Sequence, residues 1–216
     1  MSRDFSYLHP NVCEFDGRLS LVFWQGRHLL YARANVGVRG MRFVQLTTSD
    51  DNMHTWTPFQ LIELQGYAPR SGDLYFFAAQ VNPVHEDSLL AVFPLVHVFC
   101  GCIGLAISVD GMQWSAPAPL LRCSVVGDRT EDHPAAGLVR QGEMVHLYVH
   151  QHVKNIGADP ATPDSLRPHL LARERVAPSR VVRYSVPASM VWQWTLDGLH
   201  QLNLTKEAPR RVWTDI

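Results

Sequence analysis

A pattern of short apolar strands separated by turn residues dominates this chain, and it recurs with a period of about 60 residues. Residues 18–24 and 28–34 predict a hairpin closed at Gly26, because tight hairpin turns need the positive φ that glycine adopts easily. Residues 42–48 and a segment that begins near Trp56 follow as the third and fourth strands. No long window has a helical period, so we expect helix to be nearly absent.

Two further units repeat this order. The second unit has predicted strands at 74–81, 88–94, 103–107 and 113–121. The third has predicted strands at 135–139, 144–152 and 180–186, and 191–204 is its candidate closing strand, with Trp192 and Trp194 on one side. One such sheet cannot bury both of its faces alone, so successive sheets are expected to stack face to face. The repeat therefore predicts an all-β fold of stacked sheets. We expect a single β-propeller domain over 1–216, with four-stranded antiparallel blades at about 10–66, 67–125 and 126–205.

Composition excludes several classes of partner. The 216 residues are 46% hydrophobic and 18% charged, which is typical of a globular protein. The net charge of -1, with acidic and basic residues interspersed, disfavours nucleic acid and anionic membranes as partners. No apolar run approaches the roughly 18 to 20 residues that span a bilayer, and residues 1–15 lack the basic start and apolar run of a secretory signal. We therefore expect no membrane segment and, by default, a cytoplasmic protein.

Cysteine and histidine spacing does not favour a metal site. The four cysteines lack a Cys-x-x-Cys pair, and we interpret them as reduced, mostly buried thiols. His146, His150 and His152 share one face of a predicted strand. A strand rises about 3.3 Å per residue, so the outer two lie about 20 Å apart, too far for one ion. We expect a polar face there and neither metal nor cofactor, with His150 as a candidate substrate contact.

Two turns share one pattern. Ser49-Asp-Asp-Asn-Met-His-Thr-Trp56 and Ser108-Val-Asp-Gly-Met-Gln-Trp114 each have a serine, an aspartate two residues later and a final tryptophan. They occupy the same position in successive units. Serine and aspartate side chains are expected to bond exposed backbone N–H groups of the turn, while the tryptophan ring packs beneath it.

The first of these turns resembles the Asp-box of sialidases and related propellers, Ser-x-Asp-x-Gly-x-Thr-Trp, with Met53 at the usual glycine. The second is similar to a shortened form found in five-bladed glycosidase propellers. This resemblance, which covers about residues 10–186, implies a five-bladed type of propeller related to glycosyl hydrolases. A closed propeller typically needs at least four blades. A larger parent chain, closure by the terminal segments, or a second copy of the chain would therefore have to complete the ring.

The resemblance also implies where substrate lies. In the resembled enzymes, acidic residues at the starts of the innermost strands surround the sugar over the central axis. Here it implies Asp16 as base or nucleophile, Asp132 as transition-state stabiliser and Glu131 as acid. The candidate substrate contacts are Arg18, Tyr75, Arg129, His133 and His150.

Several of these residues have a second interpretation. Adjacent strand residues face opposite sides, so Glu131 and Asp132 enter one pocket together only if their segment is a loop. Asp16 before Gly17 also reads as an ordinary turn, and Arg18 as half of a strand-end ion pair. The aromatic residues expected to pack mainly between blades are Trp24, Tyr31, Tyr75, Phe76 and Phe77.

Hydrolysis of a glycosidic bond would need two carboxyl groups about 5 to 5.5 Å apart for retention, or about 6.5 to 9.5 Å apart for inversion. The function we expect is therefore that of a glycoside hydrolase-like propeller that acts on or binds carbohydrate. The alternatives are a non-catalytic carbohydrate-binding module and a protein-binding scaffold.

Overall fold

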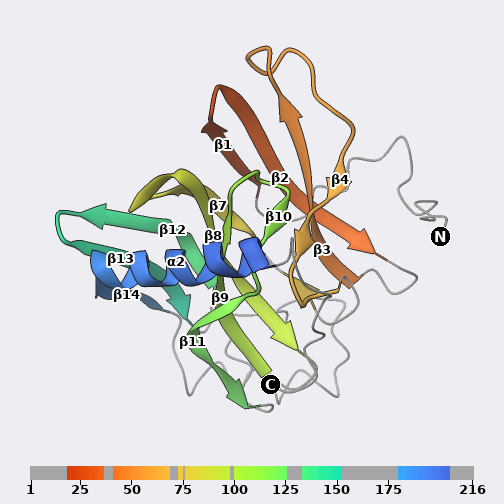
Figure 1. The fold of residues 1–216 in the computed structure, drawn as a ribbon. Helices are drawn as coiled ribbons and strands as arrows, with labels where there is room; N and C mark the ends of the chain where they lie inside the picture. The colour runs from red at the N-terminus through yellow and green to blue at the C-terminus, as the bar shows by residue number, and fades with distance from the viewer. Residues whose placement is uncertain are drawn as a thin grey trace, which may run out of the picture.

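The chain folds into three β-sheets followed by one helix, in a computed structural model that describes residues 19–36, 41–68, 73–74, 76–97, 100–125, 133–151 and 180–204 (Figure 1). The first sheet has the order β1-β2-β3-β4 and contains β1 (Ser20–Trp24), β2 (Arg27–Val36), β3 (Met41–Ser49) and β4 (Gln60–Leu61). Each strand runs antiparallel to the next. This is the up-and-down sheet predicted for the first unit.

The middle sheet is larger than one four-stranded unit. Its main path is β5-β10-β9-β8-β6, with β7 paired to β8 and β11 paired to β9. Its strands are β5 (Glu63–Leu64), β6 (Asp73–Leu74), β7 (Ala78–Asn82), β8 (His85–His97), β9 (Cys100–Ser108), β10 (Gln113–Trp114) and β11 (Ala118–Val125). The short β5–β10 pair is parallel, and the other pairs are antiparallel.

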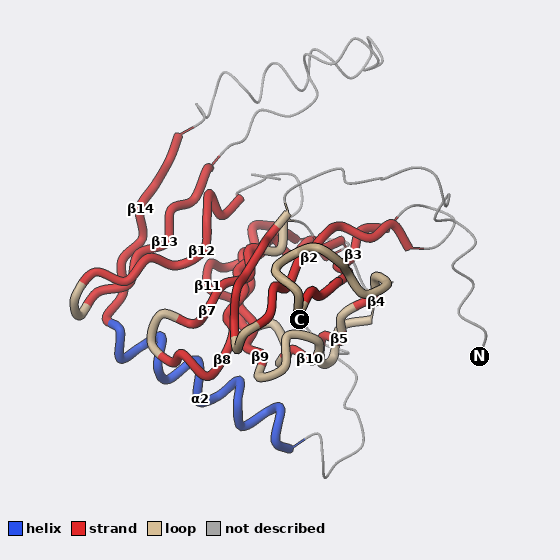
Figure 2. Tube along the Cα trace, turned by 90° about the horizontal axis from the view of Figure 1, so that it is seen from above, coloured by secondary structure: helices blue, strands red, loops and turns tan. Residues whose placement is uncertain are grey.

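The third sheet has the order β12-β13-β14, and the helix α2 follows it directly. The bounds are β12 (His133–Gln141), β13 (Met144–Gln151), β14 (Arg180–Pro187) and α2 (Ala188–Leu204). The three sheets lie side by side, with the middle sheet between the other two and α2 running along one end of the third and middle sheets (Figure 2). Antiparallel sheets stacked face to face in chain order are the blades of a β-propeller.

The helix corrects two expectations: that helix is nearly absent, and that 191–204 forms a closing strand. Ala188, Val191, Thr195 and Leu202 are all buried, and their spacing of three, four and seven residues puts them on one side of a helix. Trp192 and Trp194 therefore do not share a face, and Trp192 is 40% exposed. No helix in the described ranges is both long and apolar enough to cross a bilayer.

The middle sheet is buried on both faces, as strand β8 shows most clearly. The side chains of Leu89, Ala91 and Phe93 belong to a core between the first and middle sheets. Those of Leu90 and Val92 belong to a second core that includes the third sheet and α2. All five are fully buried, which explains why this segment is a continuous apolar run rather than an alternating one.

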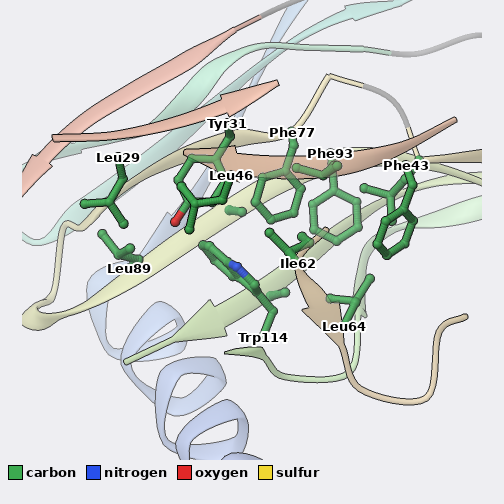
Figure 3. Packing of buried hydrophobic residues seen from close by; sticks show 14 of the residues in the cluster. Leu29, Tyr31, Phe43, Leu46, Ile62, Leu64, Phe77, Leu89, Phe93 and Trp114 are labelled. Carbon is green, nitrogen blue, oxygen red and sulfur yellow. The ribbon is translucent and has the colours of Figure 1, made fainter. Parts of the chain in front are cut away.

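Aromatic rings fill the first of these cores (Figure 3). The ring of Phe77 packs at 5.0 Å from that of Phe93, nearly parallel, and at 4.8 Å from that of Trp114, nearly perpendicular. Tyr31 joins them from β2, and its hydroxyl donates a hydrogen bond to the carbonyl oxygen of Gly111 at 2.9 Å. Desolvation by burial raises the pKa of Tyr31 far above its ordinary value, so this hydroxyl stays a donor.

The first of the two similar turns is built by side-chain hydrogen bonds. Ser49 Oγ donates to Asp51 Oδ1 at 2.8 Å and accepts from the Met53 amide at 2.9 Å. Asp51 accepts from both the amide and the hydroxyl of Thr55, which holds the pKa of its carboxyl well below the ordinary value. The predicted capping is confirmed here, whereas Trp56 remains 37% exposed.

The second turn repeats these bonds around a different backbone. Ser108 Oγ accepts from the Gly111 amide at 2.9 Å, and Asp110 Oδ1 accepts from the Met112 and Gln113 amides. Trp114 is fully buried, and its Nε1 donates to the Gly111 carbonyl at 3.0 Å. Capping and the packing of the tryptophan beneath the turn are both confirmed at this position.

Candidate functional site

The starts of β1, β7 and β12, one strand from each sheet, meet at one place. Ser20, the first residue of β1, donates from Oγ to the carbonyl oxygen of Phe77 at 2.7 Å. The same Oγ accepts from the amide of Ala79 at 3.2 Å. The beginning of β1 is therefore fixed against the beginning of β7.

The start of β12 reaches the same point from the other side. His133, its first residue, packs its ring against that of Phe76 with the ring centroids 4.7 Å apart. Phe76 and Phe77 are adjacent, so the segment leading into β7 touches both neighbouring strands. We call the group Ser20, Phe76, Phe77, His133 and His150 the hub.

A glutamine bridge holds the middle and third sheets together farther along. The side-chain amide of Gln80 in β7 donates from Nε2 to the carbonyl oxygen of Leu138 at 2.9 Å. Its Oε1 accepts from the Leu138 amide. The Gln80 side chain thus makes the two hydrogen bonds to Leu138 that the backbone of a neighbouring strand would otherwise make. These bonds fix the position of β7 against β12.

The two histidines of the hub face each other across β12 and β13, where His133 and His150 are paired residues. Burial lowers the pKa of His133, and the charge of His150 lowers it further. His133 is therefore predominantly neutral near pH 7. A neutral imidazole presents one donor and one acceptor, which suits the hydroxyl groups of a sugar.

Phe76 has a backbone conformation that few bulky residues adopt. Its φ is 43°, in the left-handed region where a side chain with a Cβ is strained. Such strain collects at binding sites and persists only where the surroundings enforce it. The sequence predicts that Phe76 packs between blades, and its ring packs on His133 of the third sheet. Its left-handed backbone could not be predicted, because no sequence signal marks a phenylalanine with positive φ.

Of the eight predicted site residues, the structure describes two and brings them together: His133 and His150. The three predicted carboxylates and three of the predicted contacts lie outside the described residues: Asp16, Glu131, Asp132, Arg18, Tyr75 and Arg129. Their roles stay predictions. In the sequence, Asp132 immediately precedes His133, and Arg18 lies two residues before Ser20.

The polar face predicted on β13 is partly described. His146 is buried, and its Nδ1 lies 2.8 Å from the hydroxyl oxygen of Ser185. His152 lies outside the described residues. Within the described parts of the chain, no group of three or more histidine, cysteine, aspartate or glutamate side chains is placed to hold a metal ion.

Comparison with known proteins gives a partial likeness. No protein-family model and no curated protein matches the chain. Among solved structures, the chain is similar to the Hadza microbial sialidase Hz136, with 14% identity and a TM-score of 0.45 over 62% of this chain and 32% of that one. It is similar to the Bombyx mori GH32 β-fructofuranosidase BmSUC1, with 17% identity and a TM-score of 0.48 over 79% of this chain and 33% of that one.

A third likeness is to Zg3597, a family 117 glycoside hydrolase of the marine bacterium Zobellia galactanivorans. Identity is 19% and the TM-score 0.37, over 61% of this chain and 41% of that one. These three neighbours are glycoside hydrolases with β-propeller folds. The chain spans about a third of the length of the first two.

Proposed function

We propose that this chain binds carbohydrate at the hub and that the hub is the start of a glycoside hydrolase-like site. The observation that carries the proposal is the meeting of three strand starts. Ser20 bonds to Phe77, and Phe76 packs on His133, so segments more than 50 residues apart in the sequence form one surface. Binding sites are typically built in this way, from segments that a rigid scaffold brings together.

The chemistry of the described hub suits a sugar. An aromatic ring offers an apolar face to the C–H side of a pyranose, and a neutral imidazole exchanges hydrogen bonds with its hydroxyls. Phe76 supplies the ring, His133 supplies the neutral imidazole, and His150, its partner across β12 and β13, is a second polar side chain. The strain at Phe76 is the local cost of presenting that ring.

Catalysis is the part of the proposal that depends on the predicted carboxylates. Asp16 would act as base or nucleophile, Asp132 as stabiliser and Glu131 as acid, with Arg18, Tyr75 and Arg129 as further sugar contacts. Two of these acids are the residues that directly precede His133 in the sequence. Support for the roles comes from the Asp-box resemblance and from this adjacency.

Binding and catalysis are tested separately. For binding, titration calorimetry against a panel of neutral and acidic oligosaccharides should give at least one ligand whose affinity falls about tenfold in Phe76→Ala and in His150→Ala. Asp87→Asn is the matched control, because Asp87 is exposed at the β7–β8 hairpin and away from the hub. Equal affinities in wild type and the three variants would show that the hub is not part of the binding site.

For catalysis, the rate of phenol release from a panel of aryl glycosides should exceed the background rate. It should fall by at least about 100-fold in Asp16→Asn and Asp132→Asn. Background rates with the whole panel, together with retained binding, would show a non-catalytic carbohydrate-binding module. Absence of both would favour the protein-binding scaffold.

A further inference from the structure

The three sheets are covered unequally. The middle sheet packs on the first sheet through one face and on the third sheet and α2 through the other. The first and third sheets each pack on the middle sheet through one face.

On the first sheet, strand β1 shows its outward face by alternation. Ser20, Val22 and Trp24 are buried, and Trp24 Nε1 donates to the carbonyl oxygen of Glu86 in the middle sheet at 2.9 Å. The alternate residues point the other way. Leu21 and Phe23 of β1 are 53% and 62% exposed, and Leu19, which directly precedes β1, is 45% exposed. Three large apolar side chains in a row on one strand face are unusual for a sheet that faces water.

On the third sheet, the outward face carries exposed aliphatic side chains as well. Val139 pairs with His146, and Val181 with His150, so both lie on the face of β13 opposite to the buried Val145, Leu147 and Val149. Val139 is 49% exposed, Val181 64%, and Met144 on the same face 37%. Apolar side chains are thus exposed at both ends of the stack, on the first sheet along β1, since Gln45 and Thr47 on the same face of β3 are buried.

We propose that two copies of the chain pack head to tail, with the outward face of the first sheet of each copy on the outward face of the third sheet of the other. Two such contacts, related by a two-fold axis along the hub, close a ring of six sheets. Heterologous contacts of this kind form a closed ring when the rotation between units permits it. Six lies within the range of four to eight blades in which propellers close, and three lies below it.

A second copy is the occupant that the chain's own stacking favours. The contact it needs, one apolar sheet face on another, is the contact already made twice inside the chain. Both open faces belong to the same polypeptide, so one type of interface covers both at once. The net charge of -1 gives two copies little mutual repulsion. This pairing does not depend on the hub binding sugar, but it would complete the wall around the hub.

The first test is the state of association. Sedimentation equilibrium should give a species of about twice the 24.4 kDa chain mass. Phe23→Glu and Val181→Glu, one on each open face, should each weaken the dimer at least about 100-fold, because a charge would be buried in an apolar contact. Leu196→Glu is the control: Leu196 is 40% exposed on α2, away from both faces, and should leave the dimer unchanged.

The second test is the geometry of the contact. A mixture of Phe23→Cys and Val139→Cys chains, treated with a short bis-maleimide, should give more cross-linked dimer than wild type, whose four native cysteines set the background. Phe23→Cys alone should give no more than wild type. Circular dichroism melts confirm that each variant is folded.

The proposal has two overturning outcomes. A chain that stays monomeric at the highest soluble concentration, with native circular dichroism, would contradict the pairing of two copies. A dimer in which Phe23→Cys cross-links to itself would show a symmetric contact between first sheets. Sugar binding can succeed or fail independently of either result.

Discussion

At the scale of single residues, the two similar turns differ in their left-handed residues, and the difference makes a prediction. The first turn has two, Asn52 with φ 57° and Met53 with φ 69°, whereas the left-handed residue of the second turn is Gly111, with φ 79°. A left-handed conformation costs a residue with a Cβ roughly 1 to 2 kcal/mol, and glycine is spared this cost. Met53 is 44% exposed, so little packing depends on its side chain.

We therefore expect Met53→Gly to raise the free energy of unfolding by about 0.5 to 1 kcal/mol, after subtracting the greater entropy of glycine in the unfolded chain. Urea unfolding monitored by tryptophan fluorescence measures the change. Met53→Ala keeps the Cβ and should bring no gain. A loss of stability in Met53→Gly would show that the methionine side chain, and not its backbone, decides the energy of the turn.

His133 predicts a dependence of stability on pH. Its pKa is lower in the folded protein than in the unfolded chain, where it is near the ordinary value of about 6.5. Between the two values the unfolded chain binds more protons, so the free energy of unfolding should rise with pH up to about 6.5. The penalty is complete below the folded pKa.

His133→Gln should make this part of the pH profile flatter, because glutamine does not titrate. The measurement is urea unfolding of both proteins from pH 5 to pH 8. His28→Gln is a suitable control, because its imidazole contacts Phe23 on the open face of the first sheet and lies away from β12. Parallel profiles for wild type and His133→Gln would contradict the expected shift.

At the scale of elements, α2 is positioned by a close contact with the middle sheet. A Cβ placed on Gly198 would lie 2.7 Å from Ile107 Cγ1 and 2.8 Å from Ile107 Cβ. Nearby, Gln201 Oε1 accepts from the Ala116 amide at 3.1 Å, which fixes the last turns of the helix over β9 and the segment before β11. Only a glycine lets the helix approach this closely.

Gly198→Ala should therefore destabilise the protein by about 1 to 2 kcal/mol, since overpacking outweighs the gain in helix propensity of about 1 kcal/mol. The cost should shrink in part in an Ile107→Ala background, which removes Cγ1, the nearer of the two atoms, and keeps Cβ. A thermal unfolding cycle of the four proteins gives the coupling between the two sites. An undiminished cost would show that the clash with Cγ1 does not determine the loss of stability.

The burial of each element explains whether it could be predicted from the sequence. The continuous apolar run at 88–94 was predicted as a strand and lies within β8, because a strand buried on both faces needs no polar residue on either. The prediction of a strand at 191–204 is wrong, because this segment is part of α2. The exposed Trp192 obscures the helical spacing of the buried residues in the sequence. Periodicity identifies a helix only when exposed apolar residues do not mask the spacing of the buried ones.

At the scale of the whole molecule, the proposed dimer predicts a melting temperature that depends on concentration. A folded state that associates is stabilised by mass action, whereas a folded monomer is not. For a chain of this size we expect a rise of about 2 °C for each tenfold increase in protein concentration. Differential scanning fluorimetry over three decades of concentration measures it, and Phe23→Glu should remove the dependence.

The sequence by itself determined the β-strands, their up-and-down order and the two capped turns. These depend on contacts between residues close in the chain: alternation along a strand, a glycine in a hairpin, a serine bonding an amide two to four residues away. Local chemistry of this kind is legible because the partners are neighbours.

Only the tertiary structure decided that Phe76 meets His133, that Gln80 bridges to Leu138, and that apolar side chains stay exposed on the outward sides of β1 and of the third sheet. Each depends on how sheets stack, and stacking joins residues more than 50 positions apart through shape and not through local pattern. A phenylalanine in a left-handed conformation has no sequence signature, because the surrounding packing, and not the residue's own preference, holds it there.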